Sequence, residues 1–273
     1  MGADQTRPLQ LAEFTMPTTL IVLAHPERRS FNGAWSDATE AAALAQGDTV
    51  LRSDLCQMGF DAAERAGHYP DWPEDTPFDP LKAQEQAAEA GTTPNEVQRE
   101  IDKIRQADRI VLHFPMWWFA PPAILKGWFD RAFQHGALHD TSHRFDSGLF
   151  RGKTVLCCVT TGSDANESAH DGKEGDIRLL LWPTAYTLRY LGFDVLEPVI
   201  AHGVHGYHKG AAKERLTERL RKVLDDQARV MADFDTRPRW PFNADSDFDE
   251  TGRLRPDRPS HGPFIRHNPD FDG

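Results

Sequence analysis

Five short apolar runs, each separated from the next by a helical pattern, constrain the fold of this chain more than any other feature. The runs are continuous and rich in branched residues, which is typical of strands covered on both faces. Strands that alternate with helices in this way predict an α/β fold, with a five-stranded, doubly wound parallel sheet and helices on both faces. The predicted strands are residues 19–24, 49–54, 109–114, 154–160 and 193–199.

Helical patterns fill most of the segments between these strands. Ser30 precedes an Ala-rich segment as a helix cap would, and Gly192 stands just past the end of another helical pattern. The predicted helices are residues 32–46, 96–106, 123–133, 177–191 and 211–234, with one further short helix in the polar excursion 59–94.

Composition divides the chain into three parts. We expect a loose N-terminal arm over residues 1–17, a sheet domain over 18–235 and an extended C-terminal tail over 236–273. The tail is rich in Pro, Asp and Arg and has little periodicity. Two interpretations of it stay open: packing over a surface or a partner, or disorder.

The charge balance and the cysteine content exclude several classes of protein. A net charge of −11 argues against a nucleic-acid partner, because phosphate needs a basic face. No apolar run reaches the roughly 18 residues of a membrane span, so we expect no stable membrane insertion, and we see no signal peptide. Three cysteines, of which Cys157 and Cys158 are adjacent, give no disulfide framework and fit a reducing, cytoplasmic location.

Ligands of doubly wound sheets bind beyond the carboxyl ends of the strands, so three loops are candidate sites. The first loop, residues 25–32, enters a helix whose backbone N–H groups, with Ser30 and Asn32, could hold a phosphate or pyrophosphate. His25 and the adjacent arginines would add donors, although neither the Rossmann fingerprint nor the P-loop is present. A plain helix cap with solvated arginines explains this loop equally well.

The second loop holds three consecutive aromatic residues between prolines: Trp117, Trp118 and Phe119. A flat apolar wall suits the stacking of a planar ring system, and the alternative is core or dimer packing. The third loop, residues 160–164, offers two threonine hydroxyls and Gly162, which permits a close backbone approach. An ordinary turn after a strand is the alternative for this loop.

Two groups of histidines could suggest a metal, but we interpret both otherwise. His135, His139 and His143 are spaced every four residues in a polar segment that we expect to be a loop. A second group, within residues 202–208, lies in a Gly-rich loop, at the edge of a cleft or in solvent. Neither group has the matching ligands and supporting residues of a zinc site, so the sequence predicts no metal site.

Taken together, the three loops resemble the NAD(P)H:quinone oxidoreductase (DT-diaphorase) family of flavodoxin-like flavoproteins. The resemblance covers roughly residues 18–235, with order and spacing included. Its most specific string is FPMWWFAPPAILKGWFDRAF. The matching strings lie within residues 20–32, 114–133, 160–183 and 191–198.

The resemblance implies FAD at a homodimer interface, with FMN as the second choice. It implies that NADH or NADPH, and then a quinone or related electrophile, use one pocket in turn for a two-electron, ping-pong reduction. By position, the residues on the pyrophosphate and adenosine side are His25, Phe31, Asn32 and Ala34. Those of the isoalloxazine wall are Pro115, Met116, Trp117, Trp118 and Phe119. Those along the other flavin edge are Thr160, Thr161, Gly162 and Ser163. The residues assigned to catalysis are Trp118, Phe119, Gly162 and Glu174.

Two departures from the family pattern concern the catalytic side chains. Ser168 and Glu174 stand where family members carry a Tyr and a His that steady negative charge on the reduced flavin. Ser168 could still donate a hydrogen bond, whereas an ionised Glu174 would oppose that charge, and His170 or Arg178 could substitute. The family's aromatic substrate-loop pair is also missing, with His139 and Thr141 near those positions.

Three alternatives remain beside the quinone reductase. An FMN-dependent azo- or nitroreductase would use the same ring wall. A flavodoxin-like regulatory subunit of a membrane transporter would explain the altered Ser168 and Glu174. The third alternative is a structural dimer without flavin.

Overall fold

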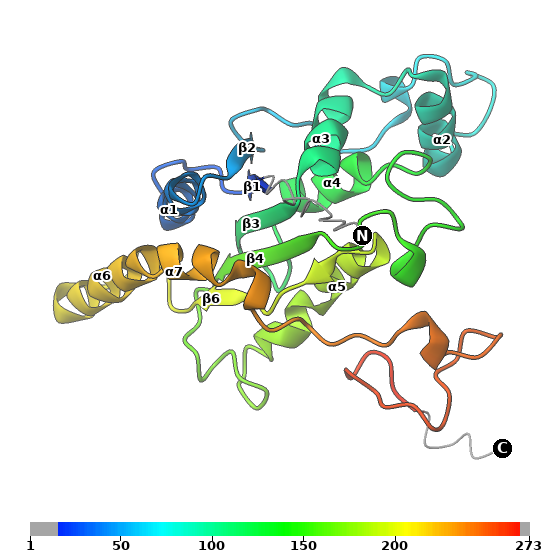
Figure 1. Cartoon of the computed structure of the whole chain (residues 1–273). Helices are drawn as coiled ribbons and strands as arrows, with labels where there is room; N and C mark the ends of the chain where they lie inside the picture. The colour runs from blue at the N-terminus through cyan, green and yellow to red at the C-terminus, as the bar shows by residue number, and fades with distance from the viewer. Residues whose placement is uncertain (1–15, 268–273) are drawn as a thin grey trace, which may run out of the picture.

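A parallel sheet forms the centre of the molecule in the computed structural model, which describes residues 16–267 (Figure 1). The strand order is β2-β1-β3-β4-β5, with β6 also paired to β4, and all of these pairs are parallel. The predicted flavodoxin-like, doubly wound fold is therefore confirmed. The strands are β1 Thr18–Leu23, β2 Thr49–Asp54, β3 Arg109–Pro115, β4 Thr154–Thr160, β5 Asp194–Val195 and β6 Val199–Ala201.

Helices cover both faces of the sheet. Two clusters of buried hydrophobic residues lie between the helices and the sheet. Helices α1, α6 and α7 pack on one of them, and α3, α4 and α5 pack on the other, on the opposite face of the sheet (Figure 1). Four short 3-10 turns complete the described elements, at Ala66–His68, Phe145–Ser147, Phe234–Thr236 and Asp245–Asp247. The helices are α1 Phe31–Ala45, α2 Pro80–Ala90, α3 Asn95–Gln106, α4 Ala123–Ala132, α5 Ile177–Tyr190, α6 Gly210–Asp225 and α7 Gln227–Ala232.

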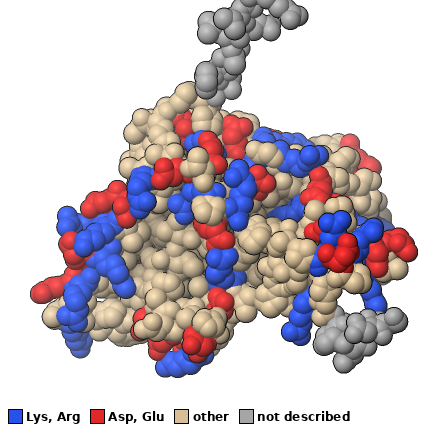
Figure 2. Space-filling view, turned by 60° about the horizontal axis from the view of Figure 1, so that its bottom comes forward, with Lys and Arg blue, Asp and Glu red and all other residues tan. Residues whose placement is uncertain are grey.

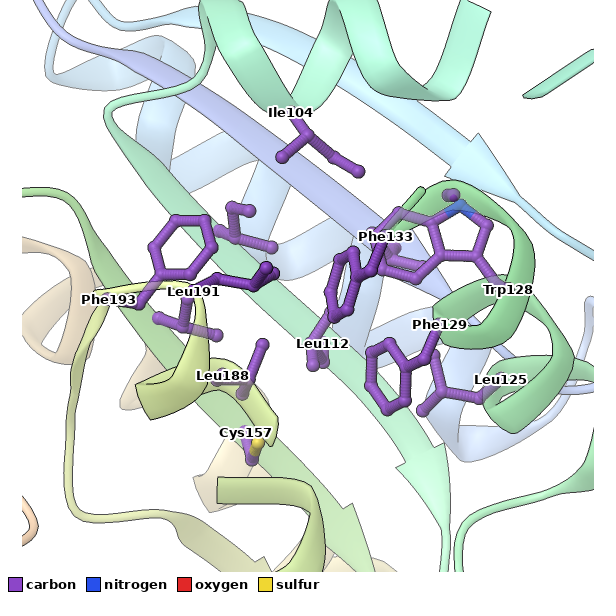
Figure 3. Packing of buried hydrophobic residues seen from close by; sticks show 14 of the residues in the cluster. Ile104, Leu112, Leu125, Trp128, Phe129, Phe133, Cys157, Leu188, Leu191 and Phe193 are labelled. Atoms are coloured by element: carbon purple, nitrogen blue, oxygen red, sulfur yellow. The ribbon is translucent and has the colours of Figure 1, made fainter. Parts of the chain in front are cut away.

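The apolar strands separate two cores because successive side chains of a strand point to opposite faces. Cys157 packs in the larger cluster and Cys158 in the smaller one, and both thiols are free. Burial raises the pKa of Cys157 to about 12, which leaves its thiol protonated and inert. Figure 3 shows the larger cluster, in which α4 residues face Leu112 of β3 while Leu188 and Phe193 fill the space beside β4.

Two predicted elements are divided in the structure. The fifth strand is split into β5 and β6 because the backbone N–H of Glu197 donates to Pro238 O of the tail (2.8 Å) and Pro198 has no N–H to give. The predicted helix 211–234 is split at Asp226 into α6 and α7, so that α7 turns onto α1. The short helix expected in the excursion is α2.

The C-terminal tail packs on the sheet domain over its described residues. The backbone N–H of Trp240 donates to Val195 O at 2.7 Å, and the Trp240 ring is buried. Farther along, the ring of Phe264 stacks on Trp182 of α5 with 4.4 Å between centroids. The three-part division of the chain remains a prediction, and most of the expected N-terminal arm lies outside the described residues.

The surface mixes charges of both signs. On the face in Figure 2, Lys and Arg side chains lie among Asp and Glu, so the excess of acid forms no single acidic face there. None of the helices in the described part of the chain combines the length and the apolarity that a membrane span requires.

A buried polar network ties the sheet to α1 and α7. The ring of His113 is buried, and its Nε2 lies 2.9 Å from the Thr39 hydroxyl. The Gln227 side chain donates to that hydroxyl (2.8 Å) and accepts from the Trp35 indole (2.8 Å). Burial lowers the pKa of His113 to about 3, so the folded protein holds this ring neutral.

We predict that His113 makes stability fall with acidification. A histidine that titrates near 6.5 when unfolded and near 3 when folded takes up its proton preferentially in the unfolded chain. Between about pH 7.5 and about pH 5 this should lower the free energy of unfolding by roughly 2 kcal/mol. Urea unfolding at both pH values, for the wild type and for His113→Gln, measures this difference. Equal pH dependence of the two proteins would contradict the assignment.

Candidate active site

The three candidate loops meet at Thr160, at the end of β4. The Asn32 side-chain amide donates to the Thr160 hydroxyl at 2.9 Å, and the Met116 N–H donates to Thr160 O at 2.7 Å. The start of α1 and the loop after β3 are therefore both attached to the loop after β4. This arrangement brings together the carboxyl ends of β1, β3 and β4, as the sequence predicted.

The start of α1 presents unused backbone donors. The Ser30 hydroxyl caps the helix by accepting from the Gly33 N–H, whereas the N–H groups of Phe31 and Asn32 have no acceptor within the described chain. Gly33 is required there because a Cβ would lie 1.9 Å from Arg28 O. A helix start with free N–H groups is a favourable position for an anion.

The arginines of this loop are already paired. Arg28 forms an ion pair with Asp37 and lies 3.6 Å from Asp54, and Arg29 pairs with Glu27 at 2.9 Å. The positive charge that the sequence suggested for this loop is therefore largely neutralised. Its anion-binding capacity depends on backbone N–H groups.

A tight turn presents the aromatic wall. Trp117 and Ala120 exchange two backbone hydrogen bonds (2.9 and 3.1 Å), and the two residues between them, Trp118 and Phe119, have φ of 49° and 62°. Bulky side chains rarely adopt this conformation, and such strain gathers at functional sites. Trp118 is 93% exposed and Phe119 is 52% exposed, so within this chain the turn does not serve core packing.

The loop after β4 is fixed by the end of β6 and by the residues that follow it. Thr161 N–H donates to Ala201 O (3.0 Å), and Thr161 O accepts from Val204 N–H (2.8 Å). An ideal Cβ on Gly162 would meet no atom within 4 Å, so open space adjoins this backbone. Nearby, the hydroxyls of Ser163 and Ser168 are 2.6 Å apart, and Ser168 is buried.

Two cavities adjoin the aromatic turn and share four residues. The volumes are about 420 Å³ and about 510 Å³, and the shared residues are Met116, Trp118, Thr161 and Gly162. The first cavity also has Phe119, Ser163, Glu167, Ser168, Glu174, Gly175, Ile177 and Leu180 in its wall. The second also has Pro115, Trp117, Thr160, Val204 and His205.

The four residues assigned to catalysis from the sequence all line the first cavity. The residues assigned to the pyrophosphate side line neither cavity, although the His25 ring lies 5.8 Å from the Trp117 ring. Of the two substitutes considered for the family histidine, His170 is exposed, and Arg178 pairs with Glu197 at 2.7 Å. Neither of them lines the first cavity.

Sequence reasoning missed Glu167 and the second cavity's Val204. Glu167 belongs to the long loop between β4 and α5, and Val204 to the loop between β6 and α6. Both loops leave carboxyl ends of strands, a signal that could have widened the search. His205, expected at a cleft edge, lines the second cavity. Within residues 16–267 no three His, Cys, Asp or Glu side chains are grouped as a metal site requires.

Comparison with known proteins agrees with this geometry. The profile of the flavodoxin-like fold matches residues 17–225. The chain is 34% identical over 208 residues to NAD(P)H dehydrogenase [quinone] 1 of Rattus norvegicus, and the alignment covers 76% of each chain. It is 38% identical over 187 residues to ribosyldihydronicotinamide dehydrogenase [quinone] of Homo sapiens, covering 67% of this chain and 80% of that protein.

Solved structures give the same picture. A Klebsiella pneumoniae protein described as a quinone reductase superposes with a TM-score of 0.77 and 29% identity, covering 88% of this chain and 94% of the other. An azoreductase shares the fold alone, with a TM-score of 0.55 and 18% identity, over 80% of this chain and all of the other. With the three loops joined at Thr160 and the profile and relatives above, this chain belongs to the flavodoxin-like family of NAD(P)H:quinone oxidoreductases.

Proposed function

We propose that this protein is an FAD-dependent NAD(P)H oxidoreductase that reduces quinones by two electrons. This proposal rests on the exposed, strained aromatic turn at Trp118, a residue that lines both cavities at the carboxyl edge of the sheet. A planar ring placed beside this turn would cover apolar surface that the chain leaves open. NADH or NADPH and the quinone would use the same pocket in turn.

The described residues fit a flavin in three respects. The exposed rings of Trp118 and Phe119 offer a wall for the isoalloxazine, and the open space at Gly162 admits an approaching ring edge. The free N–H groups of Phe31 and Asn32 suit a phosphate. A bound flavin would supply the hydride chemistry that amino-acid side chains lack.

The chain's own residues bind, orient and exclude water. The turn is held at both ends by backbone hydrogen bonds, so the backbone of Trp118 and Phe119 is fixed at the edge of the cavity. The paired hydroxyls of Ser163 and Ser168 are the nearest equivalent of the family's tyrosine, because one of them can donate into the first cavity. Reactants that stack on this wall would come within contact range of each other, and the water between them would be excluded.

We also propose a homodimer in the cytoplasm. A third cavity of about 400 Å³ lies between α4 and α5 and carries the rings of Phe129, Phe133, Trp182, Tyr186 and Tyr190. Aromatic side chains are enriched at protein interfaces. The three free thiols are compatible with a reducing compartment.

The second candidate is an FMN-dependent azo- or nitroreductase. It is favoured by the serine and glutamate at positions 168 and 174, which depart from the family's pair for quinones. The same departure suits a regulatory subunit of a membrane transporter with little turnover. The identity of the released flavin and the rate of NAD(P)H oxidation distinguish these candidates.

We predict that the purified protein is yellow and releases FAD when denatured. Chromatography of the supernatant against FAD and FMN standards identifies the flavin, and NAD(P)H oxidation with a benzoquinone measures turnover. Release of FMN would favour the second candidate, and flavin without turnover would favour the regulator. A colourless protein that binds neither flavin would refute the proposed function.

We predict that Trp118→Ala weakens flavin retention, because the exposed indole would stack on the ring. The loss of one aromatic stacking contact should raise the flavin Kd roughly tenfold, and Trp118→Phe should retain most of the affinity. Fluorescence titration of the flavin-stripped protein measures both constants. Equal flavin affinity in wild type and Trp118→Ala would remove this residue from the wall.

We predict that Gly162→Val reduces flavin binding without destabilising the fold. The added side chain would enter the space that adjoins both cavities and meet no protein atom. Gly67→Val is the matched control, since its Cβ position is equally free of neighbours and lies in neither cavity. Thermal unfolding of the flavin-stripped proteins should be similar for both variants, with weakened flavin binding in Gly162→Val alone. Full flavin retention in Gly162→Val would contradict the placement.

A further inference from the structure

The first cavity has an acidic wall. Glu167 and Glu174 both line it, and its other polar side chains are neutral hydroxyls. Both glutamates belong to the loop of residues 163–176, which carries five carboxylates and a single lysine. The first cavity therefore combines the apolar rings of Trp118 and Phe119 with two carboxylates.

Backbone hydrogen bonds hold the two glutamates side by side. The Glu174 N–H donates to Glu167 O at 3.0 Å. The Asp164 carboxylate accepts from the Glu167 N–H at 2.9 Å, and the Ile177 N–H at the start of α5 donates to Ser168 O at 3.1 Å. The loop is thus tied to itself and to α5, so the backbone that carries both glutamates is held at the cavity.

One ammonium group compensates both carboxylates only in part. Lys173 Nζ lies 3.1 Å from Glu167, whereas the Glu174 side chain has no hydrogen bond or ion pair within residues 16–267. The hydrogen bond and charge of Glu167, and then the charge of Glu174, raise the pKa of Lys173. Lys173 itself is exposed and does not line the cavity, so the cavity lining carries the two carboxylates without a cationic side chain beside them.

The second cavity differs from the first in charge. Its lining residues include His205 and no carboxylate, and its Thr160 hydroxyl accepts a hydrogen bond from the Asn32 amide at the start of α1. An anionic ligand group is therefore opposed in the first cavity and is not opposed in the second. The two cavities, which share Trp118, thus differ in the charge that they accept.

We propose that Glu174, assisted by Glu167, is a specificity-determining residue that selects ring compounds by charge. Neutral and cationic aromatic or quinonoid compounds enter the first cavity, whereas sulfonated or carboxylated ones are excluded. For electron acceptors the proposal rests on the proposed function. For the binding of inert ring compounds it rests on the cavity alone.

Inert ligands test the cavity directly. Benzyltrimethylammonium, benzyl alcohol and benzenesulfonate form a series of similar size with positive, zero and negative charge. For the purified protein as isolated, calorimetry should rank their affinities in that order. Glu174→Gln should reduce the ratio of the cation's affinity to the anion's affinity by roughly fivefold, which is the effect of one partly screened charge at contact range.

Two variants serve as controls. Glu214→Gln on α6 makes the same change in net charge away from the cavity and should leave the ratio unchanged. Glu167→Gln removes the carboxylate that Lys173 already compensates and should have a smaller effect than Glu174→Gln. Raising the salt concentration should reduce the effect of Glu174→Gln.

Benzoquinones with a trimethylammonium, a hydroxymethyl or a sulfonate substituent extend the test to the reaction. Comparing Glu174→Gln with wild type for each acceptor cancels differences in intrinsic reactivity. The variant should raise kcat/KM for the sulfonate and lower it for the cation, mainly through KM. Unchanged charge preference in both assays would overturn the proposal. Loss of quinone turnover with an intact preference among inert ligands would refute only the proposed function.

Discussion

The hydrogen bond from the Asn32 amide to the Thr160 hydroxyl is the interaction on which the site depends. It joins the start of α1 to the end of β4. The backbone carbonyl of Thr160 also accepts a hydrogen bond from the Met116 N–H of the aromatic loop. Asn32 Oδ1 is buried without a partner in the described chain, so loss of the Thr160 hydroxyl would leave the whole amide unpaired. An unpaired buried polar group costs about 1–3 kcal/mol, which makes this junction a fixed point rather than an adjustable contact.

The aromatic turn shows how the fold accepts a local cost at this junction. Two bulky residues with positive φ and large exposed rings are unfavourable features of an isolated domain. They persist because Trp117 and Ala120 are hydrogen-bonded to each other and Met116 is anchored to β4. The sheet beneath the turn therefore supports strain at the position where a planar ligand would cover exposed apolar surface.

The sequence predicted the parts of the structure that depend on local pattern. Apolar runs located the sheet, and Ser30 marked the start of α1 at the correct place because its cap is a contact within one turn. The same reasoning missed features that depend on distant partners. The fifth strand divides because Glu197 bonds to Pro238, and Arg28, which pairs with Asp37 of α1, also lies 3.6 Å from Asp54 of β2. Pro238 and Asp54 are distant in sequence from the residues that they contact, so no window of residues could show these two contacts.

The sequence predicted the aromatic wall of the candidate site but not both of the carboxylates that line it. Three consecutive aromatic residues are evident in the sequence, whereas the sequence alone does not show that Glu167 lines the same cavity as Glu174. In the structure a backbone hydrogen bond joins these two residues and both line the first cavity, whereas no carboxylate lines the second cavity. A ligand with an anionic group and a neutral ring would therefore place its ring, and not its anionic group, in the first cavity. Charge would thus set the orientation of such a ligand, and the apolar aromatic turn would add affinity without distinguishing the two orientations.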